Sequence, residues 1–214
     1  FDIFKDNQKK GFFSSNYWGN LPLYIESEGI SQNWAQLFIP NVKTPNPKAG
    51  INCLKEINTT SKKSTHRFVE EFLSFSIIFK ALKNWVKLNK KVFLLSSNNK
   101  NKFFDYGKKN FSFWELYKYD FYESLIGTTS IQNCIWVELF KKLMKELPFQ
   151  KKGFFLSENL PLEKALISEW KKNNHGDLIS VLHGPNLRFW DMQDLFDKRT
   201  FTNKKHEIIP FANK

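Results

Sequence analysis

The chain has 214 residues, of which 41% are hydrophobic and 17% aromatic, so it can bury a core of its own and is not a disordered protein. Its formal net charge of +12 favours an anionic partner, such as nucleic acid, a lipid headgroup surface or a nucleotide-bearing substrate, although the lysines are scattered as pairs and do not cluster on one element. Two distant cysteines and four widely spaced histidines exclude a disulfide framework and a close-paired zinc site, so we expect a reducing compartment and no metal.

The amino-terminal part of the chain has the pattern of a strand, a helix and a second strand. A short apolar run at 11–13 turns polar at 14–19, residues 21–27 have helical character, and residues 30–40 return to strand character. The polar loop would lie at the carboxyl edge of a parallel sheet, where such folds bind ligands. Ser15, Asn16 and Tyr17 could therefore contact an acceptor molecule, although forming a turn is the commoner role of these residue types.

The middle of the chain is predicted to contain a long loop and several helices. Residues 40–64 hold three prolines, Gly50 and a cluster of Ser and Thr, which is typical of a surface loop. A polar, low-complexity insertion is expected near 96–110, after a short strand at 92–95. Two further helices are predicted at 111–126 and 131–147. Pro148 marks the end of the second, because proline cannot continue a helix.

Residues 65–89 are predicted to form one long helix. Apolar residues cover so much of its circumference that we expect it to be buried on several sides. A membrane-spanning helix needs roughly 20 mostly uncharged residues, and the charged residues of this segment exclude that reading. Peripheral contact with a membrane remains an alternative.

The segment from Gly153 to Asp191 organises the chain, because it has the pattern of a second strand, helix and strand. Apolar runs at 153–157 and 177–182 have the length of buried strands. Between them, Pro161 suits the first turn of a helix and Gly176 follows its last turn. Parallel strands joined by a helix bring their carboxyl ends to one edge of a sheet, where ligands bind.

Glu158 and His183 follow these two strands directly, so both are candidate catalytic residues. His183 could act as a general base on an acceptor hydroxyl, because a histidine ordinarily has its pKa near neutral pH, or it could donate a hydrogen bond to a sugar or phosphate. The alternative is a structural residue at a strand end. Glu158 could be a base or could bind sugar hydroxyls, or it could cap the helix.

Neighbouring residues are candidate substrate-binding groups. Asn159 has the alternative role of a helix cap, and Glu163 that of compensating the helix dipole. The loop after the second strand adds Asn186, and then Arg188 and Asp191 on either side of two aromatic residues. Trp190 could stack on a sugar or base while Arg188 binds phosphate; alternatively the aromatic rings fill the core and the two charged groups pair on the surface.

Two strand–helix–strand units in one chain predict an α/β fold, namely a Rossmann-like, doubly wound, mainly parallel sheet with flanking helices. We expect one domain over residues 1–199, with loop insertions near 40–64 and 96–110. Residues 200–214 are expected to be a linker or tail toward a second domain outside this chain.

The chain resembles bacterial surface-carbohydrate biosynthesis proteins of O-antigen and capsule loci. The resemblance covers about Gly11 to Asp197 and is carried by two groups of residues at the ends of that span. The first is Ser15 to Pro22, with Gly29 and Asn33-Trp34; the second is Ser157-Glu158-Asn159, Glu163, Trp170, His183 and Arg188 to Asp191.

The resemblance implies a glycosyltransferase of the type with two Rossmann domains (GT-B), of which this chain is the amino-terminal, acceptor-side part. It would transfer a sugar from a nucleotide sugar to a glycan or glycolipid acceptor, in the cytoplasm or at the inner face of the membrane, with no cofactor. A different reading of the charge is a non-catalytic basic module that binds nucleic acid or anionic glycolipid, although no nucleic-acid motif is recognisable.

Overall fold

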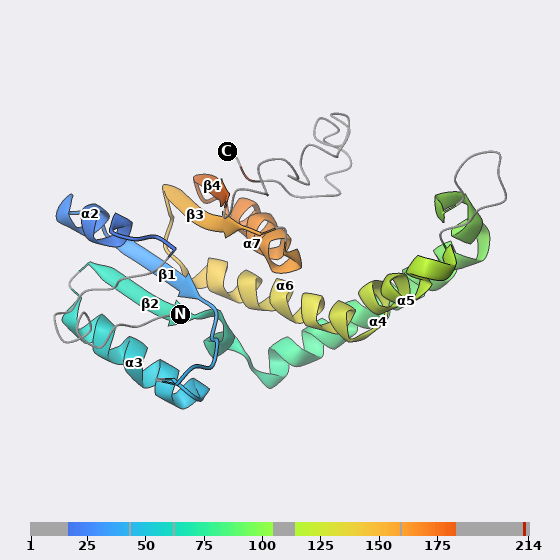
Figure 1. The fold of residues 1–214 in the computed structure, drawn as a ribbon, viewed down its shortest axis with the longest axis horizontal. Coiled ribbons are helices and arrows are strands. Elements are labelled where there is room, and N and C mark those ends of the chain that lie inside the picture. The colour runs from blue at the N-terminus through green and yellow to red at the C-terminus, as the bar shows by residue number, and fades with distance from the viewer. Residues whose placement is uncertain are drawn as a thin grey trace. The chain divides into compact units, whose positions relative to one another are not determined.

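The computed structural model describes residues 17–42, 44–61, 63–104, 114–158, 160–182 and 212. The chain divides into two compact units, Phe1–Leu73 and Ser74–Lys214, and the domain predicted over residues 1–199 spans both. Within the described residues each unit contains helices and one pair of parallel strands, so the α/β class predicted from the sequence is confirmed (Figure 1).

The first unit is built around strands β1 and β2, which pair in parallel with Gln32 opposite Ser64 and Gln36 opposite Phe68. The predicted helix at 21–27 and the predicted strand within 30–40 are confirmed. The described elements of the unit are α2 (Leu21–Ser27), β1 (Gln32–Gln36), α3 (Pro47–Thr60), β2 (Ser64–Phe68) and the short 3-10 helix η1 (Val69–Phe72).

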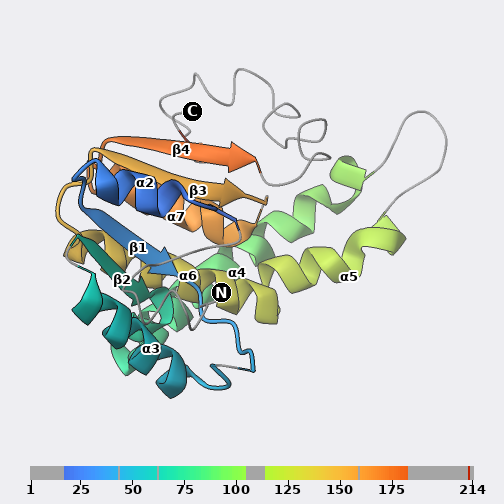
Figure 2. The same cartoon turned by 60° about the vertical axis from the view of Figure 1, so that its left-hand side comes forward.

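Helix α3 lies against β2 (Figure 2) and supplies the apolar core of this unit. Burial alternates along β2, which places Phe68 on the inner face with Leu54 and Ile57 of α3. Gly50 of α3 allows a close approach to Phe38 and Phe68, since a methyl group in its place would lie about 3 Å from both rings. Burying these side chains is the main favourable term in holding α3 on the strands.

The surface loop predicted at 40–64 is therefore wrong for residues 47–60, which form α3. Proline is compatible with a helix only in the first turn, and Pro47 occupies that turn. The side chain of Asn46 caps the helix, because its Oδ1 accepts a hydrogen bond from the backbone N–H of Ala49 at 2.9 Å. The residues that indicate a loop are thus the start signal of a helix.

The helix predicted at 65–89 is also wrong over its first part. Residues 64–68 form β2, and helix α4 (Phe75–Phe104) begins only after η1. The segment Ser64 to Phe68 alternates buried and exposed side chains, and pairing with β1 decides in favour of a strand. Helix α4 then continues through the strand predicted at 92–95 and through 96–104 of the predicted insertion, while 105–110 lies outside the described residues.

The second unit contains the parallel pair β3 and β4, with Lys152 opposite Asp177 and Ser157 opposite Leu182. Helix α6 packs against α4, α5 and α7, so it is the central helix of this unit (Figure 2). No helix of the described residues is both long and apolar enough to cross a bilayer. After α4 the elements are α5 (Trp114–Leu125), α6 (Thr128–Glu146), β3 (Lys152–Ser157), α7 (Pro161–Lys172) and β4 (Asp177–Leu182).

The predictions for this part of the chain are largely confirmed. Helices α5 and α6 lie within a few residues of the predicted bounds, and both strands and the intervening helix occur where expected. Pro161 stands in the first turn of α7, and Lys171 and Lys172 stand in the last. The start signal Pro161 is confirmed, whereas the left-handed residue that follows the helix is Asn174 (φ 56°) and not the predicted Gly176.

The contact between Gly153 of β3 and Trp170 of α7 holds helix and strands together. The indole N–H of Trp170 donates to the carbonyl oxygen of Gly176 at 2.7 Å, which fixes the ring across the amino end of the strand pair. A methyl group at Gly153 would lie 2.5 Å from Cη2 of Trp170 and 2.9 Å from Cδ1 of Leu178.

We therefore expect Gly153→Ala to destabilise the second unit by about 1–3 kcal/mol, because the buried indole cannot move without losing its hydrogen bond. Urea unfolding followed by tryptophan fluorescence measures the change. Lys152→Ala, at an exposed position of the same strand, is the control and should be near neutral. Equal stability of the two variants would contradict close packing at Gly153.

Candidate functional site

The structure describes three of the residues that the sequence proposes as a site, namely Tyr17, Glu158 and Glu163. Tyr17 is exposed in the turn that precedes α2. Glu158 and Glu163 lie together where β3 ends and α7 begins. The remaining candidates lie outside the described residues: Ser15, Asn16, Asn159, His183, Asn186, Arg188, Trp190 and Asp191.

The carboxyl edge of the β3–β4 pair carries the first carboxylate group. The strand register ends with Ser157 opposite Leu182, and Glu158 follows Ser157 with its side chain exposed to solvent. The backbone N–H of Glu158 donates to Oε1 of Glu163 at 2.8 Å. An exposed carboxylate at the carboxyl edge of parallel strands is in a position to contact a ligand hydroxyl.

Glu163 is buried and has a structural role at the start of α7. Its Oε1 accepts hydrogen bonds from the backbone N–H groups of Glu158 at 2.8 Å and Leu160 at 3.1 Å. Burial raises the pKa of this carboxyl, while the two backbone hydrogen bonds lower it. Glu163 thus satisfies two donors at the helix start, where Leu160 occupies the cap position and has no polar side chain.

A second carboxylate lies at the carboxyl edge of the β1–β2 pair. Oε1 of Glu70 accepts a hydrogen bond from the backbone N–H of Phe38 at 3.1 Å, two residues beyond the end of β1. Its Oε2 is buried and has no hydrogen-bond partner within the described residues. Burial raises the pKa of Glu70, and the nearby charge of Glu71 raises it further, against two opposing backbone hydrogen bonds. A carboxyl of this kind can exchange a proton nearer to neutral pH than an exposed one.

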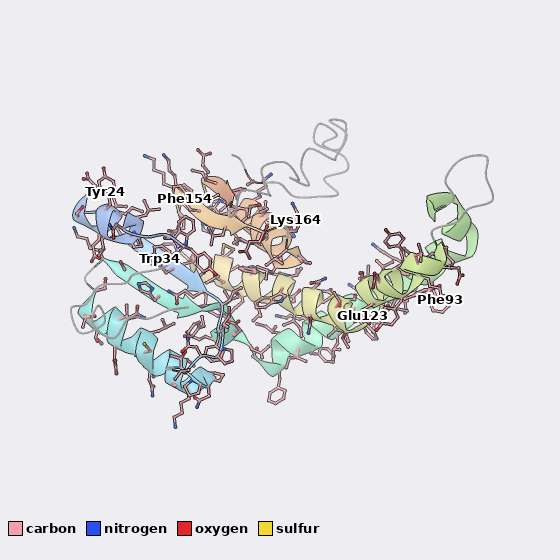
Figure 3. All side chains as sticks on the ribbon, in the orientation of Figure 1. Tyr24, Trp34, Phe93, Glu123, Phe154 and Lys164 are labelled. Atoms are coloured by element: carbon pink, nitrogen blue, oxygen red, sulfur yellow. The ribbon has the colours of Figure 1, made fainter. Side chains whose placement is uncertain are left out.

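His66 of β2 is buried beside Gln36 of β1, and Nδ1 of His66 lies 2.9 Å from Nε2 of Gln36. Burial lowers the pKa of His66 to about 4, so the imidazole is neutral at pH 7. With the amide of Gln36 donating to Nδ1, the ring proton is assigned to Nε2. The ring of Trp34 stacks parallel to the imidazole, with centroids 6.1 Å apart (Figure 3 labels Trp34).

The backbone of His66 is held from the other side by Asn58 of α3. The N–H of His66 donates to Oδ1 of Asn58 at 2.7 Å, and Nδ2 of Asn58 donates to the carbonyl oxygen of His66 at 2.9 Å. These are the two bonds that a neighbouring strand would make, so Asn58 covers the open edge of β2. His66 is therefore a buried structural part of the strand pair. Glu70, whose pKa is raised, is the candidate at this edge for gaining or losing a proton.

The sequence analysis missed the buried pair of Gln36 and His66, and also Glu70, which follows the same strand pair. The helix predicted over 65–89 includes both His66 and Glu70, so it leaves no strand beside β1. The alternation in Ser64 to Phe68 is the signal that would have identified β2. Within the described residues no group of three His, Cys, Asp or Glu side chains is placed to hold a metal ion.

Neither the family models nor the curated proteins nor the solved structures include a match to this chain.

His66 predicts a pH dependence of stability in the first unit. The unfolded chain binds a proton at His66 near pH 6.5, whereas the folded chain excludes it down to about pH 4. Stability is thus full above pH 6.5 and falls as the pH drops through this window, by up to about 3 kcal/mol. Urea titrations at several pH values measure the slope. The raised pKa of Glu70 changes the free energy of unfolding with pH in the opposite direction, so the wild type is compared with His66→Gln. This variant should make the free energy of unfolding depend less on pH between about 4 and 6.5. An unchanged slope in the variant would refute the buried neutral imidazole.

Glu163 is predicted to matter for stability through its hydrogen bonds and not through its charge. Glu163→Ala leaves two backbone N–H groups at the start of α7 without an acceptor and should cost about 1–3 kcal/mol in urea unfolding. Glu163→Gln keeps an acceptor oxygen and serves as the matched control, with a smaller loss. If both variants were as stable as the wild type, the capping role would be wrong.

Proposed function

We propose that this chain is the acceptor-side, Rossmann-like part of a glycosyltransferase that acts in bacterial surface polysaccharide biosynthesis. The supporting observation is the parallel register of β3 and β4, in which Ser157 lies opposite Leu182. These two residues immediately precede Glu158 and His183 in the sequence. The proposal assigns the acid–base chemistry of the transfer to that pair.

The chemistry of the two groups suits sugar transfer. An imidazole can accept the proton of an acceptor hydroxyl while the oxygen attacks the anomeric carbon of a nucleotide sugar and the nucleoside diphosphate leaves. Glu158, whose carboxylate is exposed at the strand end, would orient the sugar or acceptor through its hydroxyls. The proposal includes no metal or other cofactor.

The rest of the proposed substrate site combines an aromatic platform with charged groups. Arg188, Trp190 and Asp191 would bind the sugar or its phosphate, with Asn159 and Asn186 beside them. For Ser15, Asn16 and Tyr17 we keep the prediction of acceptor contacts, which rests on the sequence alone. Glu163 is removed from direct contact by its burial and its two backbone hydrogen bonds, and it positions the start of α7.

A non-catalytic basic module is the second candidate, and one observation favours it. The described part of α4 from Phe75 to Phe93 contains five lysines and no acidic residue. The lysines are therefore concentrated on one helix, although in the sequence they look like scattered pairs. Such a surface attracts nucleic acid or an anionic glycolipid. Nonspecific RNA or DNA binding that weakens steeply with salt, without turnover of any nucleotide sugar, would favour this candidate.

For the enzyme, we expect His183→Ala in the full-length protein to lower sugar transfer by about 10²-fold or more, because a general base contributes this much. Release of nucleoside diphosphate from a panel of nucleotide sugars, with membrane extract as acceptor, is the measurement. Glu158→Gln should also reduce the rate. Lys171→Ala, at an exposed position at the end of α7, is the control. Full activity of His183→Ala would remove this residue from the mechanism.

A further inference from the structure

Helix α4 carries a stripe of large apolar side chains that solvent can reach. Their spacing of four, three, four and seven residues keeps them on one face of a helix with 3.6 residues per turn. Phe75 is 92% exposed, Phe79 71% and Phe93 77% (Figure 3 labels Phe93). We call this set the α4 stripe, and it consists of Phe75, Phe79, Leu82, Val86 and Phe93.

The stripe is not the face with which α4 joins the core of its unit. Ile77, Ala81 and Val92 are buried on another side of the helix. On that side Asn84 donates to Oε1 of Glu138 at 2.9 Å, and the indole N–H of Trp85 donates to the carbonyl oxygen of Ile126 at 3.1 Å. These contacts fix the rotation of α4 about its axis, so the stripe faces outward. The expectation that this helix is covered on several sides is therefore wrong.

A row of lysines borders the stripe on one flank. At about 100° per residue, their positions fall roughly 50° to 150° from the centre of the stripe, all on the same side of it. No Asp or Glu occurs anywhere in α4. The lysines of the described turns are Lys80, Lys83, Lys87, Lys90 and Lys91.

An open groove of about 600 Å³ continues the stripe along the helix. Its wall is almost wholly apolar, formed by Trp85, Val86 and Phe93 with Asn89 and Lys90. The surface thus offers an apolar depression next to a row of exposed lysines. An exposed apolar area of this kind, rimmed by charge, marks an interaction site.

We propose that α4 is a docking surface for the anionic face of a lipid bilayer. The stripe enters the boundary between headgroups and acyl chains, and the lysine flank contacts the negative headgroups. Phenylalanine and leucine on one face with lysine beside them is the composition of helices that lie in this interface. Each lysine near an anionic bilayer adds to the attraction, and none is offset by an acid in α4.

Charge argues against a second copy of the chain as the occupant. Two α4 stripes in contact would bring two lysine flanks together without one acidic side chain from α4 to separate them. The net charge of +12 adds repulsion between whole molecules. Docking on a bilayer does not depend on sugar transfer, so this inference and the proposed function can fail separately.

Sedimentation of the chain with vesicles tests the docking. We expect binding to vesicles of equal parts phosphatidylcholine and phosphatidylglycerol, little binding to phosphatidylcholine alone, and weakening by salt. Phe79→Ser should reduce binding about tenfold, and Phe75→Ser with Phe79→Ser further, because each exposed ring is lost from the interface. Phe149→Ser is the matched control, because Phe149 is 70% exposed outside α4 and should leave binding unchanged.

Lysine variants separate the charge of α4 from the charge of the whole molecule. Lys83→Gln, Lys87→Gln and Lys90→Gln together should weaken binding to the anionic vesicles by about tenfold or more. The triple change Lys151→Gln, Lys152→Gln and Lys171→Gln removes the same net charge at exposed positions outside α4 and should have a much smaller effect. Far-ultraviolet circular dichroism of every variant should match the wild type, since all these side chains are exposed.

Three results would overturn the proposal. The first is no preference for anionic vesicles, and the second is an equal loss in Phe79→Ser and Phe149→Ser. The third is a dimer, seen by analytical ultracentrifugation, that Phe79→Ser dissociates while vesicle binding is absent; it would assign the stripe to a second copy.

Discussion

The parallel pairing of strands is the constraint on which both units depend. Parallel neighbours cannot be joined by a tight turn, so each pair needs a crossover long enough to return to the same end of the sheet. Helix α3 makes that crossover between β1 and β2, and α7 makes it between β3 and β4. Each crossover also brings the carboxyl ends of its two strands to a common edge. The candidate chemistry of this chain therefore gathers at strand ends and not along strand faces.

Two-stranded sheets leave backbone donors and acceptors at their edges, and polar side chains satisfy several of them. Asn58 bonds both backbone groups of His66, Glu70 accepts from Phe38, and Glu163 accepts from the backbone at the start of α7. Unmet groups in such buried places would cost about 1–3 kcal/mol each. The positions of Glu70 and Glu163 are thus explained by backbone hydrogen bonds before any catalytic role is considered, and the exposed Glu158 differs from them in this respect.

Helix α4 shows how one element can serve both the core and an outside partner. Ile77, Ala81 and Val92 stabilise the second unit, whereas Phe75 and Phe79 contribute little to it because solvent reaches most of their surface. Apolar side chains kept outside a core carry a solubility cost, so a surface that retains them along a whole helix face is expected to have a use. If the proposed function in sugar transfer holds, such a contact would keep the protein where a lipid-linked acceptor lies.

The sequence by itself determined the elements whose ends are marked locally: α2, β3, α7 and β4 follow from proline and apolar runs a few residues long. It did not determine α3 or β2. In the sequence Pro47 and Gly50 suggest a loop, whereas in the structure the packing of Leu54 and Ile57 on Phe68 stabilises a helix there. The segment from Ser64 to Phe68 is a strand because it pairs with β1. Which face of α4 is buried was likewise decided by α6, since apolar residues occur on two sides of that helix. Local sequence signals determine where a helix can begin and end. Which face of a helix or strand is buried depends on the element that packs against it.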